Sequence, residues 1–421
     1  MYIHNIFRVF KAIGLLIISL NCLANESITL SESEQLAIEL DFRTKQFDVS
    51  ARGLTERAVA DGQLPDPKIK FGIMNIPINS FDRRQENMTQ LQFGVQQKFP
   101  RGRTLQYKSQ QTLDIAEIDA AKADNQTKIV LRSVRISYLE LYFQNHTKTI
   151  LDQNRDLFTQ LLDITQRQYA VGRDNQHEVL RAQLELSLMD DRITEVIGAR
   201  DVAIAELAKW IGQENATKPL DPKFPELKTL PTSGMIVDYL TNHPLVKAED
   251  AVVDANEKNI NIAQEQYKPG WMIDLTYGAR SGNNLDGSSR DDFASAMILM
   301  DVPLFTDKRQ DRQLAASRLQ HMAAKYARSD LLLDLKRQVE REYALWTRLG
   351  ERHELYQQRA TLDASQNSES TLKAYQNDLT DFTTLMRARL TELDTHLAML
   401  KLQVNQAKAH AKLLYFVGEA L

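Results

Sequence analysis

Two halves of this chain carry the same sequence pattern at a nearly constant spacing, and this internal repeat is the strongest constraint on the fold. Tyr169 and Tyr375 lie 206 residues apart. The same offset places Leu180-Arg181-Ala182-Gln183-Leu184 over Met386-Arg387-Ala388-Arg389-Leu390, Phe99 over Phe305, and Trp210 over Phe416. Between these points Val134 and Tyr138 match Val339 and Tyr343 at an offset of 205, which indicates a one-residue indel. A register that otherwise holds from Phe99 to Trp210 indicates a duplicated structural unit. We therefore expect one supersecondary unit to be built twice.

A proline-rich segment separates the two copies. It contains Pro219, Pro222, Pro225 and Pro231, and such proline density is typical of an extended connector. The resulting prediction has four segments: a signal peptide over residues 1–24, a first structural repeat over 25–217, the connector over 218–232 and a second repeat over 233–421.

Each copy has the same predicted order of elements: a modest helix over about 30–60 or 245–266, two strands around a polar loop, a very long helix and a returning helix. Neither Gly nor Pro occurs from Arg103 to Val171, and from Thr306 onward Gly350 is the only one before Gly418. Helix breakers are much denser in ordinary domains. A helix of about 60 residues is a rod of roughly 90 Å. The pattern therefore predicts long paired helices, as in a bundle or coiled coil.

Three of the four predicted strands have one apolar side and one polar side, whereas the fourth, residues 294–302, is apolar on both sides. Apolar residues alternate with polar ones or glycine in each copy, and the predicted membrane-facing residues are Leu91, Phe93, Val95, Trp271, Ile273, Leu275 and Tyr277. Period-two alternation predicts strands with a different medium on each side. A hairpin packed on a soluble core would show the same alternation. In lipid, however, four strands with open edges must close into a larger barrel, which requires at least two chains.

The N-terminus predicts export from the cytoplasm. Arg8 and Lys11 precede a short apolar run, and Cys22-Leu23-Ala24 offers small residues for cleavage after Ala24. Acylation of Cys22 would need a small residue before it, and Asn21 does not fit, so lipidation is not expected. The net charge of -4 is spread over interspersed acids and bases, which does not suggest a nucleic-acid partner.

Residue patterns that carry chemistry are missing from the sequence. Cys22 is the only cysteine, and the histidines are scattered without the spacing of metal ligands. There is no Gly-rich phosphate loop, nucleophile elbow or His-Glu-x-x-His motif. We therefore predict no catalytic residue, no cofactor and no metal site, and a protein that is not an enzyme.

The segment from Tyr169 to Gln183 resembles the helix-tip signature of the TolC outer-membrane efflux family. This resemblance implies a mainly α fold with a membrane β-barrel portion: a homotrimer whose four strands per chain form a 12-strand barrel in outer-membrane lipid, continued by an α-helical barrel in the periplasm. It implies an exit duct that works with a periplasmic adaptor and an inner-membrane RND-type transporter. Leu64-Pro65-Asp66-Pro67, Asn75-Ile76-Pro77 and the segment 97–103 are similar to the CzcC- and CusC-like channels, which suggests heavy-metal ions as cargo.

The resemblance also places the periplasmic gate and the adaptor-docking tips. By position these residues are Tyr169, Gly172, Arg173, Asp174, Glu178, Tyr375, Asp378, Thr380 and Asp381. Glu178, repeated around a ring, would concentrate cations at the entrance. In the second copy Asp378 replaces the tip glycine and Thr384 stands where an acid is expected, so a simple acidic gate is not implied. A solvated turn explains the same charges.

Two other functions fit parts of this pattern. The outer-membrane component of a type I protein or toxin secretion system would have the same duct with a different cargo. A periplasmic coiled-coil adaptor would have long helices but not two strand pairs. The choice of cargo depends on the partner transporter, about which the sequence is silent.

Overall fold

The computed structural model describes residues 27–173 and 175–417 of the chain. The predicted signal peptide with Cys22, and Asp174 of the first tip, lie outside the described residues. The elements follow one another in the order α1 (Leu30–Leu40), α2 (Phe42–Asp61), β1 (Lys68–Met74), β2 (Gln90–Phe99), α3 (Thr104–Ala170), α4 (Gln176–Ile211), α5 (Gln213–Ala216), α6 (Ser233–Tyr239), η1 (Leu240–Asn242), α7 (Pro244–Glu265), β3 (Gly270–Arg280), β4 (Phe293–Asp301), α8 (Gln310–Leu355), η2 (Tyr356–Ala360), α9 (Thr361–Gln376) and α10 (Phe382–Phe416). The chain is therefore mostly helical, with strands in both halves.

Packing divides the chain into two compact units. The first comprises the described parts of Met1–Ala37 and Ser137–Glu226, and the second those of Ile38–Ile136 and Leu227–Leu421. These units reflect contacts between elements and not the sequence repeat, which stays a prediction. No helix among the described residues combines the length and the apolar character needed to cross a membrane.

The long helices predicted from the lack of breakers are present. Helix α3 has 67 residues, and α4 returns over 36. In the second copy, α8 continues through the π-helical turn η2 into α9. At this turn the Thr361 hydroxyl donates to the Tyr356 carbonyl, 2.9 Å away. The sequence pattern did not indicate this change of helix type.

The prediction of one helix over about residues 30–60 is wrong in one respect, because the helix breaks at Asp41 into α1 and α2. The Asp41 carboxylate accepts hydrogen bonds from the backbone N–H groups of Arg43 and Thr44, so it caps the start of α2. Aspartate is among the preferred N-cap residues because its short side chain satisfies the free N–H groups of the first turn. The corresponding helix in the second copy, α7, spans Pro244–Glu265 as one piece.

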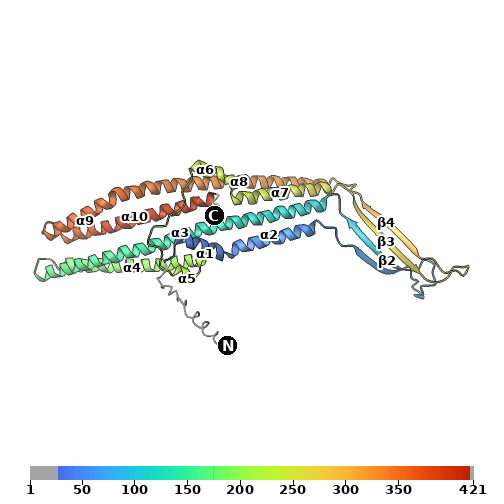
Figure 1. Ribbon diagram of the computed structural model, residues 1–421, viewed down its shortest axis with the longest axis horizontal. Helices are drawn as coiled ribbons and strands as arrows, with labels where there is room; N and C mark the ends of the chain where they lie inside the picture. Colours follow the sequence, from blue (N-terminus) through green and yellow to red (C-terminus); the bar gives the residue numbers. More distant parts are fainter. Residues whose placement is uncertain (1–26, 174, 418–421) are drawn as a thin grey trace, which may run out of the picture. The chain divides into compact units, whose positions relative to one another are not determined.

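The strands form one antiparallel sheet in the second unit, with the order β1-β2-β3-β4. Strand β2 pairs with β3, so the hairpins of both halves join in one sheet. Helices α2 and α7 lead into β1 and β3, and β2 and β4 lead into α3 and α8 (Figure 1). All four helix connections therefore lie at the same end of the sheet, which we call the helix end, and the two strand-to-strand loops lie at the loop end.

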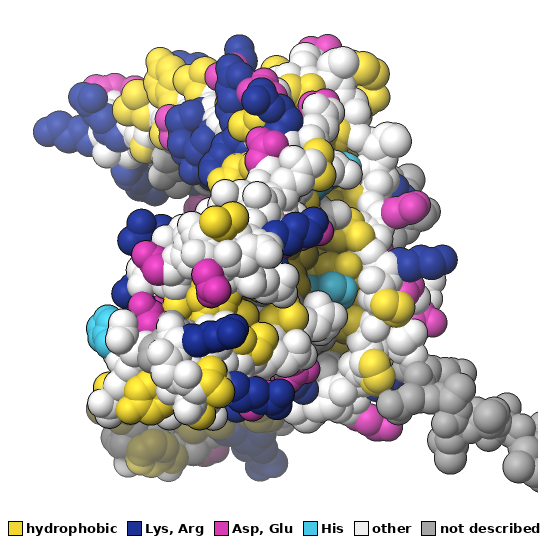
Figure 2. Space-filling view, turned by 90° about the vertical axis from the view of Figure 1, so that its left-hand side faces the viewer, with side chains coloured by type: hydrophobic (Ala, Val, Ile, Leu, Met, Phe, Trp, Pro, Cys, Tyr) yellow, Lys and Arg dark blue, Asp and Glu magenta, His cyan; other side chains and the backbone are white. Residues whose placement is uncertain are grey.

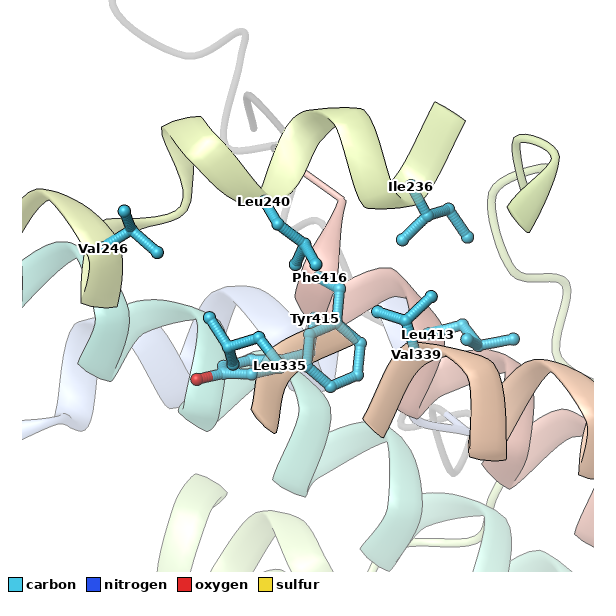
Figure 3. Close-up of a cluster of buried hydrophobic side chains, with 8 residues drawn as sticks. All are labelled: Ile236, Leu240, Val246, Leu335, Val339, Leu413, Tyr415 and Phe416. Atoms are coloured by element: carbon cyan, nitrogen blue, oxygen red, sulfur yellow. The ribbon is translucent and has the colours of Figure 1, made fainter. Parts of the chain in front are cut away.

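The core of the second unit lies where α6, α8 and α10 meet (Figure 3). Ile236, Val339 and Leu413 are each 0 % exposed. Fully burying an aliphatic side chain contributes about 1.5–3 kcal/mol. Leu335 and Val339 of α8 are both buried here, so this side of α8 is a packing surface.

In the first unit, Ile28 and the first part of the connector pack on α3. The Tyr138 hydroxyl donates to the Ile28 carbonyl at 3.0 Å, and Ile28 forms a parallel bridge with Leu220. Burial raises the pKa of the Tyr138 hydroxyl to about 12. The Tyr142 hydroxyl donates to the Pro222 carbonyl at 3.3 Å. The proline-rich connector is therefore a docked extended segment.

Candidate functional site

The sheet presents two chemically different faces. Residues paired across antiparallel strands point to the same side, so the register defines the faces directly. The apolar face consists of Ile69, Phe71, Ile73, Leu91, Phe93, Val95, Gln97, Phe99, Trp271, Ile273, Leu275, Tyr277, Ala279, Ala294, Ala296, Ile298 and Met300. It contains no charged residue. All seven residues predicted to face the membrane lie on it.

This apolar face is not covered by other described parts of the chain. Phe71 is 80 % exposed and Leu275 is 54 % exposed. Exposed apolar surfaces of this extent mark contact with a partner or a membrane. Phe99 pairs with Trp271 at the helix end of this face, and aromatic residues are enriched where a membrane surface meets water.

The opposite, polar face is held together by a charge pair that spans three strands. Lys70 of β1 pairs with Asp274 of β3 across Gly94 of β2. Asp274 also accepts hydrogen bonds from Gln96 at 3.3 Å and Thr276 at 2.9 Å. A Cβ atom on Gly94 would lie 2.7 Å from Thr276 Oγ1 and 3.0 Å from Lys70 Cε. Glycine at this position therefore leaves room for the pair.

The two loops at the other end of the sheet are joined by Arg290. Its Nη1 donates to the carbonyls of Arg84 and Glu86, each at 3.1 Å, and of Ser281 at 3.2 Å. The guanidinium of Arg280 lies 3.9 Å from the ring centre of Phe293. The long polar loops predicted from sequence are thus ordered by arginine contacts with backbone oxygens.

The first helix tip, between α3 and α4, ends α3 with a Schellman motif. The N–H of Arg173 donates to the Gln168 carbonyl at 2.9 Å, and the N–H of Gly172 donates to the Tyr169 carbonyl at 3.0 Å. Gly172 has a φ of 75°, the left-handed conformation that this motif requires. Tyr169 is 47 % exposed. Glu178 lies in the first turn of α4, where a negative charge is favoured by the helix dipole.

The second helix tip, between α9 and α10, has the same motif with different residues. The N–H of Leu379 donates to the Ala374 carbonyl at 2.9 Å, and the N–H of Asp378 donates to the Tyr375 carbonyl at 3.1 Å. Asp378 has a φ of 58°. Tyr375 is buried against Phe382, with ring centres 6.0 Å apart.

Thr380 and Asp381 complete the second tip. Thr380 is half-buried, and Asp381 is the N-cap of α10, where its carboxylate accepts from the N–H of Thr384 at 2.6 Å. In the first tip Asn175 makes no such side-chain bond. Of the predicted tip residues, then, Gly172, Asp378 and Asp381 set the turns, whereas Tyr169 and Arg173 lie on the surface.

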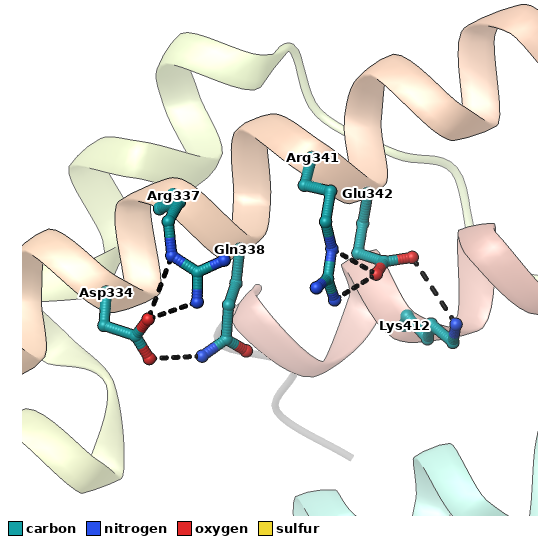
Figure 4. A network of polar contacts seen from close by, with 6 residues as sticks. All are labelled: Asp334, Arg337, Gln338, Arg341, Glu342 and Lys412. Carbon is teal, nitrogen blue, oxygen red and sulfur yellow. Dashed lines mark hydrogen bonds and ion pairs between the residues drawn. The ribbon is translucent and has the colours of Figure 1, made fainter.

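Charged side chains elsewhere form ion pairs within α8 and between α8 and α10. Glu342 of α8 is 4 % exposed; its Oε1 accepts from Arg341 at 2.7 Å, and its Oε2 lies 3.6 Å from Lys412 Nζ of α10 (Figure 4). Asp334 accepts from Arg337 and Gln338 on the same helix. On the face shown in Figure 2, basic, acidic and apolar side chains are interspersed, as on solvated helix surfaces.

Within residues 27–173 and 175–417, no three His, Cys, Asp or Glu side chains are grouped so that they could hold a metal ion. The features described above are surfaces: the two faces of the sheet and the two tips. Sequence alternation predicted the apolar face, but the pair of Lys70 with Asp274 depends on the order of the strands and was missed.

The comparisons with known proteins agree with this architecture. Residues 235–419 match the family described as outer membrane efflux protein. Protein CyaE of Bordetella pertussis is 29 % identical over 183 residues, which cover 41 % of this chain and 37 % of CyaE. The chain thus matches little more than a third of the length of this curated relative.

Solved structures extend the likeness to nearly the whole chain. The outer membrane protein VceC of Vibrio cholerae matches with a TM-score of 0.78 at 16 % identity, over 93 % of this chain and 96 % of VceC. CusC, whose structures concern transmembrane channel formation, matches with a TM-score of 0.76 at 14 % identity, over 91 % of each chain. At these identities the likeness establishes the fold.

Proposed function

We propose that this chain, which belongs to the outer membrane efflux protein family and has the fold of its channels, is the exit duct of a tripartite efflux system. It is placed in the outer membrane and extends into the periplasm. The observation that carries the proposal is the uncovered, uncharged face of the sheet opposite a polar face. Lipid suits the first face and a water-filled passage suits the second.

The edges of the sheet require further copies of the chain. In the described structure β1 and β4 each pair on one side only, and an unpaired backbone group in lipid costs several kcal/mol. Pairing β4 of one copy with β1 of the next makes a head-to-tail contact, which closes into a ring when repeated. Three copies, as the family resemblance implies, give a barrel of 12 strands.

The helices beside the edge strands support the same contact. Helix α2 leads into β1 and exposes Phe42 and Val49 at 78 % and 67 %. Helix α8 follows β4 and exposes Leu319 and Tyr326 at 66 % and 69 %. The copy that pairs its β1 with β4 of its neighbour also brings its own α2 beside α8 of that neighbour. These side chains are then buried between neighbouring copies, which stabilises the ring.

The helix tips are the part of the duct that meets its partners. A periplasmic adaptor contacts the exposed residues of the tips, such as Tyr169 and Leu379, and an RND-type inner-membrane transporter supplies the energy. The duct itself is passive and performs no catalysis. A periplasmic adaptor role for this chain is less well supported, because it gives the apolar face of the sheet no lipid to contact.

Fractionation, sizing and conductance test the proposal together. The chain should be found in the outer membrane, remain a trimer in mild detergent, and open pores in planar lipid bilayers. Light scattering coupled to gel filtration gives the mass of the protein without detergent. A water-soluble monomer that never conducts ions would contradict the proposal.

A further inference from the structure

Charged residues on the sheet are confined to the polar face, and cations outnumber carboxylates there. The face carries Lys68, Lys70, Lys98 and Arg280 against Asp274 and Asp301. This excess is local, because the whole chain has a net charge of -4. The polar face is therefore basic on an acidic protein.

Two of these cations are engaged by neighbours. Lys70 pairs with Asp274. Arg280 lies at the loop end, where its guanidinium stacks on Phe293 and donates to the carbonyl of Asn87 at 3.2 Å. Lys68 and Lys98 lie toward the helix end, and no described residue forms an ion pair with either. Both side chains are exposed, so their charges act on solutes that pass along this face.

Further cations continue this surface beyond the sheet. A cavity of about 490 Å³ at the helix end is lined by Lys98, Arg101 and Lys108, with Asp61 and Asp301 as the acidic lining residues. Arg101 is oriented by a 2.6 Å hydrogen bond from its Nη1 to the Gln266 carbonyl. Asp61 accepts from the Thr112 hydroxyl at 2.7 Å and lies 3.8 Å from Arg57, so part of its charge is already balanced.

We propose that Lys68, Lys98, Arg101 and Lys108, which we call the basic band, bind anions and make the duct selective for anionic solutes. This inference rests on the duct function proposed above, in which the polar face lines the passage. Repeated around a ring, the band places rows of positive charge where the sheet meets the helices. Rings of Lys or Arg attract anions and repel cations in other pores. Phosphate- or carboxylate-bearing solutes are then the favoured cargo, and free metal cations are disfavoured.

Ion selectivity in planar lipid bilayers tests the inference. With unequal KCl on the two sides, the reversal potential gives the permeability ratio of Cl⁻ to K⁺, which should exceed one for the wild type. The double variant Lys68→Gln/Lys98→Gln should lower that ratio by about fivefold, the factor that corresponds to about 1 kcal/mol between unit charges about 4 Å apart in water. Raising the salt concentration should lower the wild-type ratio as well, because salt screens exposed charges.

Matched variants separate charge from folding. Lys68→Arg/Lys98→Arg keeps the charge and should keep the selectivity. Lys223→Gln/Lys228→Gln removes the same charge from the connector and should leave the ratio unchanged. A conducting wild-type channel that prefers K⁺, or a glutamine variant that conducts with wild-type selectivity, overturns this inference alone. A chain that never conducts overturns the duct function and the inference with it.

Discussion

Gly172 and Asp378 occupy the same position in two separate helix tips. Each is the left-handed residue of a Schellman motif, with φ of 75° and 58°, and the two lie 206 residues apart in the sequence. The tip glycine of the first half is thus replaced by a residue with a Cβ, although the backbone is unchanged. This conformation is free of strain for glycine and costs energy for other residues.

The substitution Asp378→Gly should therefore stabilise the second tip by about 1 kcal/mol. Conversely, Gly172→Ala should destabilise the first tip by a similar amount, although no atom lies within 4 Å of the added Cβ. Hydrogen exchange at the amides of each tip measures this local stability. Faster exchange at 377–380 in Asp378→Gly would contradict this expectation.

Gly94 should be far less tolerant of a side chain than Gly72 on the neighbouring strand. A Cβ on Gly94 would lie 2.8 Å from the Leu275 carbonyl oxygen, whereas nothing lies within 4 Å of one on Gly72. Overpacking of this kind costs about 1–3 kcal/mol. Gly94→Ala should thus lower the temperature at which the proposed trimer dissociates on gels, and Gly72→Ala should change it little. Equal effects of the two variants would argue against this packing.

A charge added to the apolar face of β3 should impair membrane insertion, whereas a charge added to its polar face should not. Leu275 lies on the apolar face and its neighbour Thr276 on the polar face. An arginine facing lipid near the middle of the membrane costs about 2–4 kcal/mol. Leu275→Arg should therefore reduce the fraction of protein folded into vesicles, measured by protease protection, whereas Thr276→Arg should insert normally. Normal insertion of both variants would show that the apolar face does not contact lipid.

Which features could be predicted from the sequence depended largely on how far apart in the chain the interacting residues lie. Alternation at Leu91, Phe93 and Val95 predicted a strand and its apolar side, because that pattern is local. The break at Asp41 was missed, since an N-cap inside a helical stretch has only a weak signal. Lys70 and Asp274 lie in different halves of the chain, and only the order of the strands brings them together. The basic band lies within residues 68–108, but the alternation of the strands did not single out its charges, and Asp301, an acidic residue beside it, comes from the other half of the chain.

His243 connects the packing of the second unit to pH. The ring is 3 % exposed; its Nδ1 accepts from the N–H of Leu245 at 3.3 Å, and its Nε2 lies 3.3 Å from the Tyr415 carbonyl. These contacts fit a neutral ring that donates from Nε2. Burial, and the nearby charge of Lys128, lower the pKa of His243 to about 4.

The unfolded chain therefore binds a proton at His243 more readily than the folded chain does. Because the folded pKa lies below the unfolded value of about 6.5, the associated stability is fully present above pH 6.5 and is lost as the pH falls toward 4. The loss is on the order of 3 kcal/mol. Thermal unfolding followed by circular dichroism at pH 7.5 and 4.5 should show it. His243→Asn keeps a capping residue without titrating and should reduce this pH dependence, whereas the exposed His177→Asn should not. An unchanged pH dependence in His243→Asn would assign the effect to other groups.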